Sequence, residues 1–551
     1  MSETNGVAYG FLSVKNVFDG RGRGSPSTLL ALTARALTGH LESLTRLGRA
    51  SAAGCSTVMR VSRTCGVLAA ALGVLPFTPA QAQSQRPPLA GARPVQAAPQ
   101  ITPSPQQPRP VMVQPDLSIV QLRPDQVELL RRVLGDAYTH GFEPEAFAPD
   151  QAVSQAQLIG LTLAYARAVR TGRLPANGFM NEWGLRPAPY DPTIDFLNAW
   201  QQDRLAEWLD SLPPPYTGYQ TLRTGLATYR DIAAKGGWQP LAAGPELKEG
   251  ATGARVVALE ARLAAEDPTI AVDGAPIFDA ALTQAVQRAQ KRFGLNPNGI
   301  VDKATLAALN TPVEQRIDQI VANMERWRWL PQTLPADRIQ VNVAAAILSV
   351  FHHDTPTLTM RAVTGRPGDE TPMLSSMIHS IVLNPPWNVP PSIASKELWP
   401  KERAHPGYLA RNDFIVIPTE GGGSRLQQKA GPKAALGRVK FDFNNPYGVY
   451  LHDTPIRSKF DSFSRLASHG CVRLQKPIEL AKALMEGDPT WTPEKIDETL
   501  ASGDTVRARL PQQIAVFLLY WTAYVTPDGQ VNFRQDPYGW DRELVQRIAA
   551  L

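Results

Sequence analysis

The sequence predicts a multidomain α+β protein, in which helical segments come first and a mostly β domain follows. A chain of 551 residues is too long for one ordinary hydrophobic core. Between residues 116 and 311, apolar residues recur at three- and four-residue spacing, which predicts helices with one buried face. From about 335 to 510, short β-branched runs alternate with Gly, Pro and Asn, which predicts strands and turns.

The first 82 residues have the pattern of an export signal. Arg60 and Arg63 precede a short apolar run, which is followed by Ala80-Gln81-Ala82, a small-x-small cleavage site. The apolar run is too short to span a bilayer, so a retained membrane anchor is the less favoured alternative. A long preamble precedes this signal, and Met59 is therefore a second candidate for the true start of the protein. We expect cleavage directly after the small-x-small site.

Removal of this segment changes what charge and cysteine content imply. Eight Lys or Arg and three Asp or Glu lie in residues 1–82, so this segment carries +5 of the formal charge of +6. The rest is nearly neutral and gives no reason to expect nucleic acid as a partner. Cys55 and Cys65 leave with the signal, and Cys471 remains. A lone thiol in an oxidising compartment is a liability unless it is buried or used.

Two regions separate the signal from the first chemical motif. Residues 83–115 are rich in Pro and Gln and predict a semi-extended linker. Residues 116–240 predict an α-helical scaffold domain without evident chemistry of its own. Its helices are expected near residues 127–134, 158–167, 193–212 and 219–235.

Residues 245–311 predict a compact three-helix unit, with apolar helical runs near 256–263, 282–295 and 305–310. This pattern resembles the peptidoglycan-binding domain found on many wall enzymes. The order Ala289-Gln-Lys-Arg-Phe293 departs from the usual one. A generic helical spacer is the alternative interpretation.

A Trp-rich helix over 317–330 is expected to lead into the β domain of residues 335–510. The chain after it, 511–551, predicts a strand pair and a closing helix that pack back on the scaffold domain. Within the β domain, strands are expected at 338–343, 346–351, 358–363, 378–383, 414–418, 439–443 and 449–451.

The residues that can carry chemistry lie in two blocks, Gly448-Val-Tyr-Leu-His452-Asp-Thr-Pro455 and Ala467-Ser-His469-Gly-Cys471-Val-Arg473. A cysteine attacks carbonyl carbon as a thiolate, which requires a base or a cation beside it. Backbone N–H groups around Gly470 could stabilise an oxyanion. The guanidinium of Arg473 suits a substrate carboxylate.

These two blocks resemble the signature of the L,D-transpeptidase catalytic domain. Further matches make the chain similar to the large periplasmic subgroup, which also carries scaffold and peptidoglycan-binding domains. They are Asn384-Pro-Pro-Trp-Asn-Val-Pro-Pro-Ser-Ile393, Pro406-Gly-Tyr-Leu409, Gln428-Lys-Ala-Gly-Pro432, Ala435-Leu-Gly-Arg-Val-Lys440 and Tyr450-Leu-His-Asp-Thr-Pro455.

The resemblance assigns roles to individual residues. It implies that Cys471 is the nucleophile, that His452 is its base and that the main-chain carbonyl of Asp453 orients the imidazole. His469 and Gly470 would shape the oxyanion pocket. We favour His452 over His469 as the base, because a base must meet the thiol in hydrogen-bond geometry. Arg473 and Ser468 would contact the substrate or hold the loop.

The resemblance also implies a reaction, a location and an inhibitor class. Cys471 would attack a tetrapeptide stem of peptidoglycan, release D-Ala and form a thioester. The side-chain amine of an acceptor stem would then resolve this thioester into a 3→3 cross-link. No cofactor is expected, the location would be the periplasm, and carbapenem β-lactams would acylate the same thiol.

An insert at about 387–430 could cap the site, as in the subgroup, or be an aromatic-rich structural loop. Its first residues, Trp387 and Asn388, are expected to contact substrate. Tyr450 alternates with His452, so both should face the same side of a strand. Tyr450 is expected to line the substrate site, with core packing as the alternative.

Other interpretations of the histidines and of the cysteine exist. Cys471 could be a buried structural residue, or His452, His469 and Cys471 could hold zinc. His352 and His353 fit a turn at a strand end better than a ligand pair. At the level of the whole protein, the alternatives are a non-catalytic wall-binding scaffold, a metallo-carboxypeptidase and an L,D-carboxypeptidase that uses water as acceptor.

Overall fold

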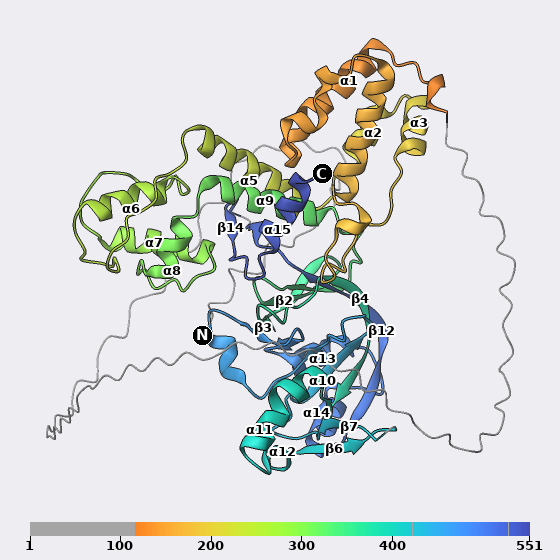
Figure 1. Ribbon diagram of the computed structural model, residues 1–551, viewed down its shortest axis with the longest axis vertical. Coiled ribbons are helices and arrows are strands. Elements are labelled where there is room, and N and C mark those ends of the chain that lie inside the picture. Colours follow the sequence, from red (N-terminus) through yellow and green to blue (C-terminus); the bar gives the residue numbers. More distant parts are fainter. Residues whose placement is uncertain (1–115, 421, 527) are drawn as a thin grey trace, which may run out of the picture. The chain divides into compact units, whose positions relative to one another are not determined.

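The computed structural model describes residues 116–420, 422–526 and 528–551, which belong to one compact unit. The expected signal at 1–82, with its alternative start, and the linker at 83–115 lie outside the described residues. Within the described part, no helix has the length and apolar character needed to cross a membrane. Helices and a large sheet are both present, so the predicted α+β class is confirmed (Figure 1).

The first helices enclose a hydrophobic core of their own, which includes Leu130, Phe142, Tyr165 and Phe196. The helix expected over 193–212 is wrong in one respect, because the chain forms two helices there. They are separated at Asp203, whose φ of 57° is incompatible with a right-handed helix. The helices of this core are α1 (Pro124–Gly135), α2 (Gln155–Thr171), α3 (Thr193–Gln201) and α4 (Leu205–Asp210), whereas the next helix, α5 (Thr217–Ala234), packs into the main core of the chain.

The expected three-helix unit is formed by α6 (Ala254–Ala264), α7 (Ala280–Arg292) and α8 (Lys303–Leu309). Asp279 and Asp302 cap α7 and α8 by accepting hydrogen bonds from backbone N–H groups of the first turn. Gln290, within the segment that departs from the usual order, is buried and joins α7 to the turn before α8. Its amide donates to the carbonyl of Ile300 at 2.8 Å and accepts from the N–H of Gly299 at 2.9 Å.

Helix α9 (Val313–Trp327) begins four residues earlier than the expected Trp-rich helix and ends three residues earlier. It contacts α5 and the C-terminal helix α15 (Trp540–Ala549). The fully buried Glu325 is compensated by Arg328 at 2.7 Å and Arg173 at 3.3 Å. An unpaired charge at this depth would be strongly destabilising, so these contacts fix the packing of α9.

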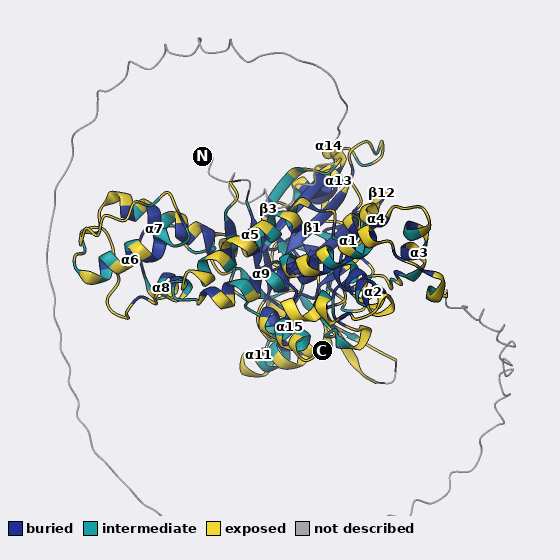
Figure 2. Cartoon of the chain, turned by 90° about the horizontal axis from the view of Figure 1, so that it is seen from above, coloured by how far each residue is buried: buried dark blue, intermediate teal, exposed yellow. Residues whose placement is uncertain are grey.

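A nine-stranded sheet forms the β domain, in the order β10-β3-β11-β9-β8-β4-β12-β1-β2. Since β2 also pairs with β3, the sheet closes on itself. Buried residues are concentrated in its strands, as Figure 2 shows for the region around β1. The strands are β1 (Arg338–Asn342), β2 (Ile347–His352), β3 (Thr355–Gly365), β4 (Leu374–Leu383), β8 (Val439–Phe443), β9 (Leu451–His452), β10 (Leu466–Ser468), β11 (Val472–Leu474) and β12 (Val506–Leu519).

Strand β12 corrects the expected end of the β domain at residue 510. It pairs with β4 over both of its halves and with β1, so the sheet continues to Leu519. The register shifts between Arg509 and Ile514, and Pro511 lies in this irregular stretch. A proline at a strand irregularity does not end the strand, although its sequence reads as a boundary.

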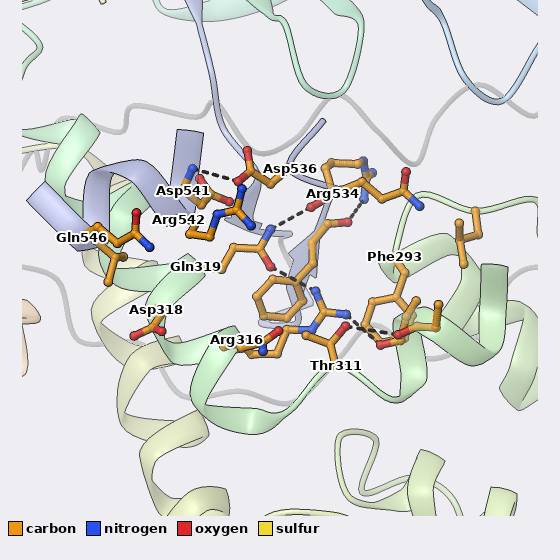
Figure 3. Close-up of a pocket in the computed structure, with 17 residues that line it drawn as sticks. Phe293, Thr311, Arg316, Asp318, Gln319, Arg534, Asp536, Asp541, Arg542 and Gln546 are labelled. Atoms are coloured by element: carbon orange, nitrogen blue, oxygen red, sulfur yellow. Dashed lines mark hydrogen bonds between the residues drawn. The ribbon is translucent and has the colours of Figure 1, made fainter. Parts of the chain in front are cut away.

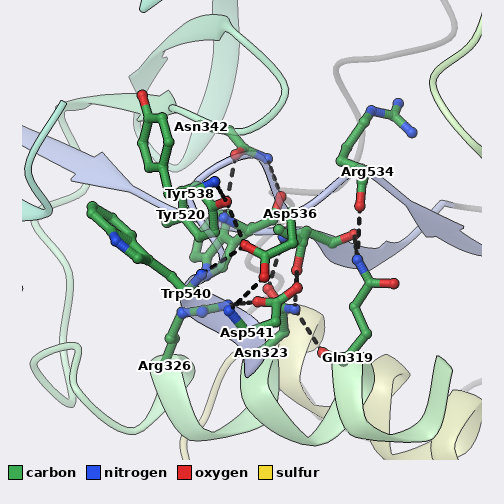
Figure 4. Close-up of polar contacts among 12 residues, drawn as sticks. Gln319, Asn323, Arg326, Asn342, Tyr520, Arg534, Asp536, Tyr538, Trp540 and Asp541 are labelled. Carbon is green, nitrogen blue, oxygen red and sulfur yellow. Dashed lines mark hydrogen bonds and ion pairs between the residues drawn. The ribbon is translucent and has the colours of Figure 1, made fainter. Parts of the chain in front are cut away.

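The C-terminal segment forms β13 (Ala523–Val525), β14 (Val531–Phe533) and α15, so the expected strand pair and closing helix are present. Buried polar contacts join this segment to α9 (Figure 4). Arg326 contacts Asp541 at 2.5 Å, and Asn323 donates to the hydroxyl of Thr522 at 2.7 Å. The helices α13 (Pro477–Leu484) and α14 (Pro493–Ser502) contact β8 and β4, respectively.

The insert between β4 and β8 has a small core of its own, which includes Val389, Leu398, Leu409 and Leu426. Its three strands pair in the order β5-β7-β6. The elements are β5 (Trp387–Asn388), α10 (Pro391–Ile393), the π-helical turn η7 (Ala394–Leu398), α11 (Trp399–Ala404), α12 (Tyr408–Arg411), β6 (Phe414–Pro418) and β7 (Ser424–Gln428).

Candidate active site

Two short neighbouring strands bring the chemical residues together. Strands β9 and β11 run parallel, and Arg473 lies opposite His452 in their register. The N–H of Val472 donates to the carbonyl of Tyr450 at 3.1 Å, which places the preceding residue, Cys471, beside Tyr450. The two sequence blocks, about twenty residues apart in the chain, therefore meet on adjacent strands.

His452 is buried and neutral. Its Nδ1 lies 2.5 Å from the main-chain carbonyl of Asp453, so Nδ1 carries the proton that this carbonyl accepts. Burial, reinforced by the charge of Arg473, lowers the pKa of His452 to about 3. The imidazole therefore remains unprotonated at Nε2 near neutral pH, which is the form that a general base requires.

Cys471 is a half-buried free thiol. Burial raises its pKa, while hydrogen bonds from Tyr450 and the positive charges of Lys440 and Arg473 act in the opposite direction without reversing the shift. The thiol is therefore protonated at neutral pH. A base beside Cys471, as expected from the sequence, would therefore be needed to form the thiolate.

Tyr450 links the thiol to the insert. Burial is the main cause that raises the pKa of its hydroxyl, which hydrogen-bonds both Cys471 and Trp387. Its ring lies 5.6 Å from that of His452 in a T-shaped arrangement, so the two side chains share one side of the strand as expected. The Nζ of Lys440 lies 4.3 Å from the centre of the Tyr450 ring. Tyr450 is thus a contact of the thiol, and it also packs against the main hydrophobic core, in agreement with the core-packing alternative. Its role in lining the substrate site stays a prediction.

Hydrogen bonds within the turn, and one from Thr371, hold the loop before Cys471 in place. Ser468 is buried and donates from Oγ to the carbonyl of Cys471 at 2.6 Å. Gly470 has a φ of 99°, and its carbonyl accepts from the hydroxyl of Thr371 at 2.8 Å. The N–H of Gly470 is directed to Ser468 at 3.3 Å. The N–H of Cys471 makes no hydrogen bond to another described residue and is free to meet an oxyanion.

His469 is engaged away from the thiol. Its Nε2 lies 2.6 Å from the carboxylate of Glu397, which belongs to the insert. Arg366 approaches the same carboxylate at 3.6 Å. Burial alone would raise the pKa of Glu397, but the hydrogen bond and charge of His469 outweigh it and hold that pKa below its usual value. Of the two candidate bases, His452 therefore has the suitable environment, and His469 joins the insert to the loop.

The remaining predicted residues divide into two groups. Arg473 forms no ion pair with another described residue, and its Nε is buried without a partner. Burial lowers its pKa, so an incoming carboxylate would relieve an uncompensated cation. Trp387 reaches the site through its hydrogen bond with Tyr450. The carbonyl oxygen of the Asn388 side chain accepts from Arg425 and Gln427 within the insert, and the structure does not bring it to the thiol.

Three residues of the site were not among the sequence candidates. Lys440 lies opposite His452 in the pairing of β8 with β9. Polar and apolar residues alternate in β8, so its sequence could have indicated that Lys440 shares a face of the sheet with His452. Thr371 and Glu397 gave no local signal, because each contacts the Cys471 loop from a segment at least 72 residues away.

The distances between ligand atoms argue against a zinc site formed by His452, His469 and Cys471. Among the described residues, one group of His, Cys, Asp or Glu has its ligand atoms within 4.8 Å of one another, namely Asp337, His352 and His353. His452, His469 and Cys471 do not meet this condition. The positive φ values of His353 and Asp354, 49° and 62°, agree with the turn expected at this strand end.

Three segments of the chain match family models. Residues 336–492 match the L,D-transpeptidase catalytic domain, and residues 121–226 match the scaffold domain. Residues 252–309 match the model described as "Putative peptidoglycan binding domain". A protein of Haemophilus influenzae named "Putative L,D-transpeptidase" is 32% identical over 251 residues, which are 42% of this chain and 50% of that protein. The match thus spans about half the length of this curated relative.

Solved structures of L,D-transpeptidases are also similar to this chain. An L,D-transpeptidase from Xylanimonas cellulosilytica is 16% identical over 51% of this chain and 100% of that chain, with a TM-score of 0.15. L,D-transpeptidase 3 from Mycobacterium tuberculosis, in complex with a faropenem-derived adduct, is 12% identical over 34% of this chain and 60% of that chain, with a TM-score of 0.18. TM-scores this low support no further conclusion.

The part of the β domain that matches the L,D-transpeptidase catalytic domain contains both motif blocks. The segments that match the scaffold and peptidoglycan-binding models precede it in the chain.

Proposed function

We propose that the chain is a periplasmic peptidoglycan L,D-transpeptidase that forms 3→3 cross-links through a thioester on Cys471. One observation carries this proposal. A neutral imidazole, His452, has its Nδ1 committed to the Asp453 carbonyl and lies on the strand next to the thiol. The peptidoglycan-binding domain supports a substrate in the cell wall.

In the first half of the reaction, Sγ of Cys471 attacks the carbonyl at the L-centre of the third residue of a donor tetrapeptide. Its proton passes to Nε2 of His452, and the oxyanion meets the free N–H of Cys471. The imidazolium then gives this proton to the amine of the terminal D-Ala. The C–N bond breaks, D-Ala leaves and the thioester remains.

In the second half, the side-chain amine of an acceptor stem attacks the thioester carbonyl. His452 accepts the proton of this amine, the C–S bond breaks, and the thiol recovers its proton from the imidazolium. The cleaved amide bond to D-Ala is replaced by another amide bond. Cys471 and His452 together suffice for the proton transfers. Arg473 has the free charge that would hold a substrate carboxylate.

The raised pKa of Cys471 and the lowered pKa of His452 support a thiol that is activated only as substrate arrives. A strained four-membered lactam carbonyl should be attacked in the same way. We therefore also propose that carbapenems acylate Cys471. The location in the periplasm depends on the export pattern of the first 82 residues.

Incubation of the purified protein with a tetrapeptide stem tests the reaction and separates it from its alternatives. We expect cross-linked dimer and one D-Ala released per link, detected by mass spectrometry, and neither product from Cys471→Ala. Free tripeptide without dimer would indicate an L,D-carboxypeptidase. No product from a folded protein that still binds sacculi would indicate a scaffold. Loss of activity with a chelator but not after thiol alkylation would indicate a metallo-carboxypeptidase.

A further inference from the structure

A cavity of about 660 Å³ lies outside the candidate active site (Figure 3). It is bordered by the end of α7 and by α8 on one side, by the first turns of α9, and by the chain from β14 into α15 on the other. None of the residues with a proposed catalytic or substrate role lines it. Its volume falls within the ~300–1,000 Å³ range of small-molecule sites.

One wall of the cavity is built around the side chain of Arg316. Arg316 is buried, with its guanidinium carbon 4.8 Å from the ring centre of Phe293 and 4.5 Å from that of Phe533. This guanidinium also donates to Gln319 at 3.0 Å and to the carbonyl of Ala308 at 2.9 Å, while its Nε is buried without a partner. The aromatic and amide contacts fix a preformed surface that retains an unused donor.

The inner charges of the cavity are already compensated. Asp541 contacts Arg326 at 2.5 Å and accepts from the Thr522 hydroxyl at 2.7 Å. Asp536 accepts from the hydroxyl of Tyr520 at 2.7 Å. These groups have little capacity left for a ligand, and they make the inner wall stable when the cavity is empty.

Two other charged side chains that line the cavity have no such partners. Asp318 on α9 and Arg542 on α15 are exposed to solvent and form no hydrogen bond or ion pair with another described residue. Desolvation raises the pKa of Asp318, and the charges of Glu143 and Glu314 add to this effect, as expected for a carboxylate without a cation. Three side-chain amides at the opening, Gln315, Gln535 and Gln546, are equally without a partner among the described residues. Figure 3 places Asp318, Arg542 and Gln546 together at the α9 and α15 side.

This set of groups defines the chemistry of an occupant. An exposed carboxylate can bind an ammonium group, an exposed guanidinium can bind a carboxylate, and free amides pair with peptide groups. The cavity is also lined by the apolar side chains of Ala307, Leu295 and Val545, which suit methyl groups. A short zwitterionic peptide with small side chains can use all of these groups at once, whereas an anion or a cation alone would use one of the two charged side chains.

We propose that this cavity is a second binding site for uncross-linked stem peptides, separate from Cys471, in which Asp318 binds the free amine of the diamino acid and Arg542 binds a carboxylate. The identity of the peptide rests on the proposed function, while the class of ligand rests on the cavity. Occupancy of this site would hold the enzyme on regions of the wall where stems remain available for cross-linking.

Photo-crosslinking with a diazirine-bearing tetrapeptide stem, followed by peptide mapping, distinguishes this cavity from the active site in one experiment. The full chain carrying Cys471→Ala is used, so that turnover does not consume the probe. We expect labelling of segments 311–319 and 533–546 in addition to any labelling near Cys471. Asp318→Asn or Arg542→Gln should reduce labelling of these segments about tenfold, which corresponds to ~1.4 kcal/mol.

Glu128→Gln and Arg132→Gln serve as matched controls, because both residues are exposed on α1 and remote from the cavity lining. They should leave labelling unchanged. Labelling confined to the region of Cys471, or labelling of 311–319 and 533–546 that persists in Asp318→Asn and Arg542→Gln, would overturn the second site. Such a result would leave the proposed reaction intact, because that reaction is measured separately with the native thiol. Conversely, failure of Cys471 to react would not remove labelling at the cavity.

Discussion

The Nε2 of His469 lies 2.6 Å from the carboxylate of Glu397 and so connects the loop of the nucleophile to the insert at 387–430. The ring of His469 is oriented toward the insert, which supports the proposal that His452 and not His469 is the base. Because the contact joins the insert to the Cys471 loop, a change in the position of one should affect the other.

Removal of this contact should loosen the insert. We expect Glu397→Gln to lower the rate of Cys471 acylation by a carbapenem a fewfold, because a partly exposed charged pair contributes ~0.2–1 kcal/mol. Hydrogen exchange should become faster in 387–430. Glu420→Gln is the matched control and should change neither quantity, because this carboxylate of the same insert is exposed and has no hydrogen-bond or ion-pair partner among the described residues. Unchanged hydrogen exchange of residues 387–430 in Glu397→Gln would show that other contacts hold the insert in place.

The pH dependence should reflect a neutral His452. Because its pKa is lowered to about 3, the base remains competent far below the ordinary histidine range near 6.5. The thiol pKa is raised, so no thiolate forms by simple ionisation at neutral pH. We expect the acylation rate to be nearly constant from about pH 5 to pH 8. An inflexion near pH 6.5 in this profile would contradict the assignment of His452 as a buried neutral base.

The lowered pKa of His452 also makes the stability of the folded protein depend on pH. The folded protein resists protonation of His452, whereas the unfolded chain accepts a proton near the ordinary pKa of about 6.5. This contribution to stability is therefore present above pH 6.5 and is lost as the pH falls from there toward 3. Urea unfolding of the native protein and of His452→Gln should differ in their slope against pH below 6.5. Parallel curves would count against the shift.

The hydroxyl of Tyr450 should lower the pKa of the Cys471 thiol. Its hydroxyl hydrogen-bonds Cys471 and favours the thiolate, so Tyr450→Phe should raise the thiol pKa further and slow acylation about tenfold. Ultraviolet titration of the thiolate measures the pKa directly. Tyr447→Phe is a suitable control, since that hydroxyl donates to the carbonyl of Asn181 and not to the thiol. A thiol pKa that is identical in Tyr450→Phe and the native protein would refute the role of this hydroxyl.

Gly470 should be required for the loop geometry. Its φ is 99°, and an added Cβ would lie 3.2 Å from the carbonyl oxygen of Glu370. Gly487 has a comparable φ of 83° with open space around it. Both Gly→Ala substitutions should cost on the order of 1 kcal/mol of stability. Only Gly470→Ala should also slow acylation, and equal acylation rates in the two variants would show that the Gly470 turn does not position the nucleophile.

Sequence reasoning located the helical and β regions and the two motif blocks, because these depend on local periodicity and on residues close together in the chain. It misplaced the end of the β domain, since Pro511 lies in an irregular stretch inside β12. It also extended one helix through Asp203, whose positive φ is a tertiary outcome that no local pattern requires.

The protonation state of Cys471 and the contacts around it were harder to predict from the sequence. Motif spacing indicated Cys471 and His452 but not the poorly solvated environment that keeps the thiol protonated. The contacts of Thr371 with Gly470 and of Glu397 with His469 join segments far apart in the chain, and neither carries a signature. Burial and long-range contacts, which depend on the complete fold, account for both omissions.

The most direct test of the account is the intact mass of the native protein and of Cys471→Ala after treatment with meropenem. We predict one covalent adduct on the native protein, mapped to Cys471, and none on the variant. A well-folded native protein that forms no adduct, or an adduct of equal yield on Cys471→Ala, would contradict the assignment of this thiol as the nucleophile.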